Sequence, residues 1–214
     1  SVSHYLLARA LETVRLKEKD IKVVNTSDAD IIAAYGTQDV TAVVTWNPQL
    51  SAIKGQAGAS PVFDSSQIPG EILDMLVVNT ETLKDNPKLG KALVGAWYET
   101  MAVMAADDAA GKAAREAMAK ASGTDLAGFD AQLKTTRMFY APAEAVSFTK
   151  SDDLVETMDL VRTFSFDHGL LGQGAKSADA VGMAFPGGKT LGDAKNVKLR
   201  FDAEYMSMAA EGKL

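Results

Sequence analysis

The first third of the chain alternates between short apolar runs rich in β-branched side chains and short segments with helical periodicity. The runs at 21–25, 39–45 and 61–64 are each bounded by turn residues, a pattern typical of buried strands. Apolar residues at helical spacing predict helices over 3–15, 29–35 and 49–53. Because strands that alternate with short helices form parallel sheets, this part of the chain predicts a doubly wound α/β lobe.

The pattern changes after Pro69. Residues 72–79 predict one more strand, and from Glu81 onward the periodicity is mostly helical, with helices expected from Pro87 and over 108–121, 126–133 and 152–171. A late strand at 197–201 precedes a last helix at 203–211. The chain therefore divides near Pro69 into a βα lobe, residues 1–69, and a mostly helical remainder, residues 70–214.

The predicted strands in residues 70–214 are too few to form a stable sheet by themselves. The remainder has two strand candidates, and a lone pair of strands is marginal without further strands or packing. No strand precedes the opening helix, although a βα unit would place one there. We therefore expect further strands upstream of Ser1. We also expect the 214-residue chain to expose the apolar surface that those strands would cover, and so to self-associate.

Composition narrows the class of protein. The chain is 47% hydrophobic and its mean hydropathy is −0.03, values typical of a globular protein. Its longest apolar runs fall far short of the roughly 20 residues that span a bilayer. The net charge is −6 without a cluster of Lys and Arg, so a nucleic-acid surface is not expected. The absence of cysteine excludes disulfides and thiolate chemistry.

Polar loops are expected at one edge of the predicted sheet. In an open α/β sheet the loops after the strands face the ligand crevice, which would gather the start of the first helix, Trp46 with Asn47, and Asp64. The helix start, with Ser1 and Ser3, offers unpaired N–H groups to an anion or carbonyl. Trp46 offers an apolar or cation–π wall. As alternatives, Trp46 fills the core and the polar loops are caps and solvated turns.

The sequence contains few residues and motifs that could support catalysis or bind a metal. The two histidines, His4 and His168, are far apart in sequence and fall in different predicted lobes. His168 is expected at a helix end, where a cationic side chain suits the helix dipole. No HExxH, GxSxG or P-loop motif is present. We expect no catalytic residue, no metal and no cofactor.

Several segments together resemble a known family. The segments 1–7, 25–30, 39–48 and 68–74, with 95–100 and 135–140, resemble the nitrate, sulfonate and taurine type of solute-binding proteins of ABC importers. Within that type the resemblance is to the branch encoded beside urea carboxylase and assigned to urea-type solutes. It extends over essentially all 214 residues.

This resemblance implies a type II periplasmic-binding fold, in which two α/β lobes close on a ligand and deliver it to a membrane permease. Residues 1–69 would be the second lobe and residues 70–214 the rest of the first, with the opening half of that lobe and a signal segment upstream. The protein would be periplasmic or lipid-anchored. The solute would be small, and either nitrogenous or oxyanionic. By position, its contacts would be Ser1, Ser3, Trp46, Asn47 and Asp64, with Thr136 and Met138 from the first lobe.

Other readings follow from the same observations. If the ligand carries a guanidinium, Trp46 with Asp64 or Glu71 would be the natural partners. An enzyme of the pyrimidine-precursor or menaquinone-pathway type shares the two-lobed scaffold, so the fold alone leaves catalysis open. A sensor or docking module is a third possibility.

Overall fold

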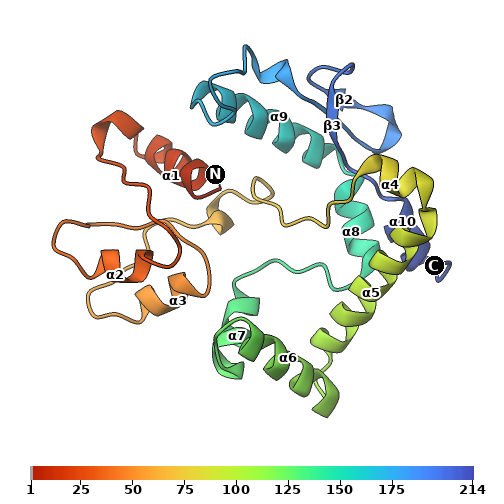
Figure 1. Cartoon of the computed structure of the whole chain (residues 1–214), viewed down its shortest axis with the longest axis horizontal. Helices are drawn as coiled ribbons and strands as arrows, with labels where there is room; N and C mark the ends of the chain where they lie inside the picture. Colours follow the sequence, from red (N-terminus) through yellow and green to blue (C-terminus); the bar gives the residue numbers. More distant parts are fainter. Residues whose placement is uncertain (1) are drawn as a thin grey trace.

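The computed structural model describes residues 2–214 and shows a mixed α/β chain with about 53% helix and one small sheet (Figure 1). The α-helices are α1 Val2–Thr13, α2 Ile31–Tyr35, α3 Gln49–Lys54, α4 Thr80–Asp85, α5 Pro87–Ala105, α6 Ala109–Ala121, α7 Leu126–Lys134, α8 Pro142–Thr149, α9 Asp152–Asp167 and α10 Glu204–Ala210. The longest helices, α5, α6 and α9, lie between residues 87 and 167. Two short 3₁₀ turns, η1 Glu18–Asp20 and η2 Ser65–Gln67, follow α1 and α3.

Several helix starts are fixed by local signals. The side chain of Asp108 accepts a hydrogen bond from a backbone N–H of the first turn of α6, and Asp125 does the same for α7 and Ser151 for α9. Pro87 occupies the first turn of α5, where its missing N–H costs nothing. These are short-range signals, and the predicted helices that carry them are confirmed. Helix α8 was not predicted, and α9 ends before the predicted residue 171 because Gly169 takes a positive φ of 69°.

The sheet lies near the C-terminus and has three strands in the order β2-β1-β3, formed by β1 Gly182–Ala184, β2 Thr190–Leu191 and β3 Val197–Arg200. β1 pairs with β2 antiparallel and with β3 parallel. The predicted strand at 197–201 is therefore confirmed as β3, and its two partners were missed. One face of the sheet packs on α9, where Phe185 joins Leu154 and Met158 in a buried cluster.

The strands predicted for 21–25, 39–45, 61–64 and 72–79 are wrong: no strand pairing is present in residues 2–181. Their β-branched side chains favour extended backbone, but a strand also needs a neighbour for its N–H and C=O groups. The side chains are largely exposed, with 67% of Val24, 90% of Val62 and 69% of Val77 open to solvent. A parallel doubly wound sheet in residues 2–69 is accordingly absent.

A second buried cluster joins α1 to α9. Tyr5 and Ala8 of α1 pack with Ile68 and with Phe164 of α9. Residues on both sides of Pro69 therefore contribute to one core, and α1 lies near the end of α9 (Figure 1). The division of the chain near Pro69 stays a prediction. In residues 2–214 no helix combines the length and the apolar character that a membrane crossing requires.

Candidate functional site

The loop before α3 holds two of the predicted ligand residues. Trp46 is 48% exposed, so its ring is at the surface and the alternative of a fully buried core aromatic is wrong. Asn47 follows it and accepts a hydrogen bond through Oδ1 from the Ser51 hydroxyl at 2.7 Å, across the first turn of α3. Ser3 lies partly exposed in the first turn of α1. Ser1 falls outside the described residues.

Asp64 is held as an anion by its own loop. Its Oδ1 accepts from both the hydroxyl and the backbone N–H of Ser66, the latter at 2.9 Å, and so caps η2. These hydrogen bonds, the hydroxyl first, together with the charge of Lys54, lower the pKa of Asp64 below its ordinary value. The exposed carboxylate is therefore available to a cationic group, with one oxygen committed to the cap.

The two predicted residues beyond α7 are less engaged. Thr136 is exposed and its hydroxyl donates to the carbonyl of Gln132 at 3.2 Å. Met138 is half-buried in the segment that leads to α8. In residues 2–214 no hydrogen bond joins two of the predicted ligand residues, and neither of two cavities described below is lined by any of them. Their convergence on one site stays a prediction.

Three unpartnered polar atoms lie close in sequence to the predicted residues. They are the hydroxyl oxygen of Thr45, Oε1 of Gln49 and Nε2 of Gln132, each buried and without a hydrogen-bond partner in the part of the chain described. Thr45 and Gln49 flank Trp46 and Asn47, and Gln132 precedes Thr136 by one helical turn. Buried polar groups are nearly always paired, so these atoms mark positions that a ligand or water would satisfy. Sequence reasoning missed the two glutamines, because a glutamine in a first or last helical turn carries no distinctive signal.

The cavities lie elsewhere. One, of about 400 Å³, opens between β1, β3 and the start of α10 and has an apolar floor of Phe185 and Phe201, whose rings stack at 4.9 Å. Lys150 stands at its rim and donates to the Ser207 hydroxyl at 3.3 Å. The other, of about 260 Å³, lies between α5 and α6. Both are open to solvent.

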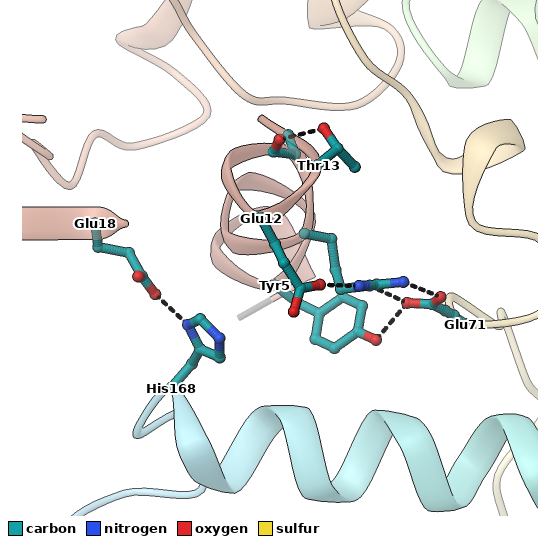
Figure 2. Close-up of polar contacts among 8 residues, drawn as sticks. Tyr5, Glu12, Thr13, Glu18, Glu71 and His168 are labelled. Atoms are coloured by element: carbon teal, nitrogen blue, oxygen red, sulfur yellow. Dashed lines mark hydrogen bonds and ion pairs between the residues drawn. The ribbon is translucent and has the colours of Figure 1, made fainter. Parts of the chain in front are cut away.

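A polar cluster of long-range contacts fastens α1 to the chain beyond η2 (Figure 2). Arg9 donates to both carboxylate oxygens of Glu71 at 2.8 Å, and the Tyr5 hydroxyl donates to Glu71 Oε2 at 2.5 Å. Arg9 also pairs with Glu12 and lies over the Phe164 ring at 5.2 Å. We call Tyr5, Arg9, Glu71 and Phe164 the Glu71 cluster.

The Glu71 side chain is only 6% exposed. Burial, together with the hydrogen bond to this carboxylate, raises the pKa of Tyr5, and the hydrogen bond to Glu71 raises the pKa of Arg9. The sequence suggested that Glu71 could meet a guanidinium of the ligand. Its partner in the structure is instead the guanidinium of Arg9, so Glu71 is already paired within the protein.

The two histidines meet on one carboxylate, although the sequence placed them in separate lobes. His168, at the end of α9, contacts Glu18 Oε1 through Nδ1 at 2.8 Å, and His4 Nε2 lies 3.9 Å from the same oxygen (Figure 2 shows the first contact). The His168 ring also stacks on Phe164, with the ring centres 4.0 Å apart. Burial pushes the pKa of Glu18 up, but the hydrogen bond with His168 and neighbouring charges outweigh it and lower the pKa. Among residues 2–214 no group of three or more His, Asp or Glu side chains is arranged to hold a metal ion.

Comparison of the chain with protein-family models, curated proteins and solved structures gives no match.

Proposed function

We propose that the chain is the solute-binding component of an ABC importer, of the nitrate, sulfonate and taurine type. In this proposal it is non-catalytic and works outside the cytoplasmic membrane. It captures a small nitrogenous or oxyanionic solute between two lobes of a type II periplasmic-binding fold and delivers it to a permease. Residues 1–69 are the second lobe in this proposal, and residues 70–214 are the remainder of the first. The proposal rests first on the segments that resemble this family.

The observation that carries the proposal is the half-exposed indole of Trp46, which lies in the sequence between two residues with unpartnered buried polar atoms, the Thr45 hydroxyl and Gln49 Oε1. A large aromatic ring beside a few unsatisfied polar groups is the usual composition of a small-molecule site. An unpaired buried acceptor costs about 1–3 kcal/mol, a cost that a ligand N–H would remove. Loops before helices are also where α/β proteins bind ligands.

The chemistry of these groups favours a donor-rich solute. Oε1 of Gln49 and the Thr45 hydroxyl accept hydrogen bonds, and the ionised carboxylate of Asp64 attracts a cation. The face of the Trp46 indole attracts a planar cation by cation–π interaction. A urea or guanidinium group presents several N–H donors in one plane, which acceptors of this kind can receive, whereas nitrate has no donor to offer them.

Tryptophan fluorescence tests the proposal, because the chain has two tryptophans and each can be removed in turn. The variant Trp97→Phe leaves Trp46 as the reporter, and the matched variant Trp46→Phe leaves Trp97, which is equally exposed at 48%. Each is titrated with urea, guanidinium, taurine and nitrate up to about 10 mM, well below denaturing concentrations. We expect a saturable change in the emission of Trp46 with at least one nitrogenous solute, and none in the emission of Trp97.

Calorimetry of the unmodified protein with the same solutes provides a label-free check. No heat and no fluorescence change with any of the four would refute the proposed function. Saturable binding that persists unchanged in the variant Trp46→Ala would preserve a binding protein but refute this site. With a guanidinium ligand, Asp64→Asn keeps the cap on η2 and removes the charge, so binding should weaken by about tenfold, as one charge-assisted hydrogen bond implies.

A further inference from the structure

The only two histidines of the chain contact a single carboxylate, and the three residues come from three different elements. His4 lies on α1, Glu18 on η1, and His168 at the end of α9. The sequence separation of Glu18 and His168 is 150 residues, so this contact is one of tertiary structure. Because histidine is the side chain that gains its charge between pH 8 and 5, the strength of such a contact depends on pH in the physiological range.

We propose that Glu18 and His168 form a proton-dependent latch, which holds the turn after α1 against the end of α9 in mildly acidic solution and loosens it as the solution becomes neutral. Such a latch is independent of the proposed transport function. It determines how firmly the segment that ends α1 is attached to the second half of the chain.

The geometry of the latch favours His168 over His4 as the main partner. His168 Nδ1 is within hydrogen-bond distance of Glu18 Oε1, at 2.8 Å, whereas His4 Nε2 is 3.9 Å away. The side chains of Glu18 and His168 are 27% and 24% exposed, and that of His4 is 43% exposed. The less exposed and closer pair is less screened by solvent, so it carries more of the interaction.

The orientation of His168 is fixed by packing. Its ring is stacked on Phe164, and this phenylalanine is itself buried against Tyr5 with ring centres 5.3 Å apart. A preorganised ring loses little freedom when it binds the carboxylate. When the ring gains its second proton, the Nδ1–H···Oε1 contact joins two opposite charges, so it becomes stronger than the contact between the same carboxylate and a neutral ring.

The charged groups around His168 are few. Glu18 faces His168 from η1, and His4 of α1 lies near the same Glu18 carboxylate. Arg9 lies over the ring of Phe164, and Asp167 precedes His168 at the end of α9. Burial raises the pKa of Glu18, but the hydrogen bond with His168 and the other hydrogen bond and charges around it together outweigh burial and lower the pKa, so its carboxylate stays ionised in mildly acidic solution.

Two backbone amides report on the latch directly. The N–H of Asp20 donates to the Lys17 carbonyl at 2.9 Å and that of Ile21 to the Glu18 carbonyl at 3.3 Å, so both are protected only while the turn η1 is formed. Their exchange with solvent, measured by NMR at about pH 5.5 and pH 8 and normalised to intrinsic rates, gives the stability of the turn. In the unmodified protein we expect about fivefold greater protection at the lower pH, the factor that corresponds to about 1 kcal/mol, the upper range for a partly exposed ion pair.

Four single variants complete the experiment. Glu18→Gln and His168→Gln should each abolish the pH difference, and His4→Gln should leave most of it. Glu12→Gln serves as the matched control, because it removes a carboxylate of α1 that pairs with Arg9 and not with a histidine. Equal protection at the two pH values in the unmodified protein would overturn the latch. So would a pH difference that survives in either Glu18→Gln or His168→Gln.

Discussion

Replacement of Glu71 by glutamine tests whether the Glu71 cluster fastens α1 to the rest of the chain. In the structure the carboxylate accepts three hydrogen bonds, two from Arg9 and one from the Tyr5 hydroxyl. A carboxamide offers one oxygen and one NH₂ group, so if its oxygen receives Tyr5 and Arg9 Nε, its NH₂ faces Arg9 Nη2, another donor. The variant therefore loses one hydrogen bond and leaves the Arg9 charge without its buried partner.

The magnitude follows from burial. Breaking a buried ion pair by removing one partner costs about 3–5 kcal/mol. Arg9 is 17% exposed and keeps a second carboxylate, Glu12, so part of that cost is relieved. We expect Glu71→Gln to lower the free energy of unfolding by about 2–3 kcal/mol, which at a slope of about 2 kcal/mol per M shifts the urea midpoint by about 1 M.

Glu12→Gln is the matched control. It removes the other carboxylate that pairs with Arg9, but Glu12 is 54% exposed and its ion pair is worth at most about 0.5 kcal/mol. Both variants are unfolded in urea at neutral pH and followed by circular dichroism. If the midpoint of Glu71→Gln moves no further than that of Glu12→Gln, the cluster does not stabilise the fold as reasoned here.

Three further predictions concern packing and pH. Gly90→Ala would place a methyl group 2.4 Å from a tyrosine ring of α10, so we expect it to destabilise the protein by about 2 kcal/mol. Gly95→Ala has room for the methyl group in the same helix, α5, and should stabilise the protein by about 0.5 kcal/mol. Thermal melts measure both changes. Leu154→Ala, at a 2% exposed position of α9, should cost about 3 kcal/mol in urea unfolding, and Leu160→Ala, 45% exposed, under about 1 kcal/mol. The raised pKa of Tyr5 contributes stability below its ordinary value near 10 that is lost as the pH rises further, so Tyr5→Phe should show a smaller fall in urea midpoint between about pH 9 and pH 11.5 than the unmodified protein. An equal fall in both proteins would contradict the assignment.

The helices could be predicted from the sequence because their signals are local. Asp108, Asp125 and Ser151 each cap the helix that follows within three residues, and Pro87 begins a helix as its geometry requires. The strand predictions before residue 80 failed because a strand depends on a neighbour that the local pattern cannot supply. The prediction of a strand at 197–201 is correct because β1 supplies that neighbour and pairs with β3 at three positions.

The candidate site was predictable only in part. The sequence predicted a helix just after Trp46 and Pro48, which α3 confirms, but it left open whether the indole fills the core, and the structure has it 48% exposed. The meeting of His4 and His168 on Glu18 was not predictable, because it joins residues 150 positions apart through the packing of α1 on α9. Glu71 was recognised as a guanidinium acceptor, but nothing local indicated that Arg9 would occupy it.

The segment between η2 and α4 gives the chain a natural point of cleavage. Met75, Leu76 and Val77 are 46%, 49% and 69% exposed and their backbone takes part in no strand pairing, so a protease with a preference for apolar residues should cut there before it attacks the helices. The upstream fragment would carry α1 and Glu71, and the downstream fragment Phe164 and His168. Because these residues pack together, the nicked halves should stay bound through gel filtration and separate only in denaturant.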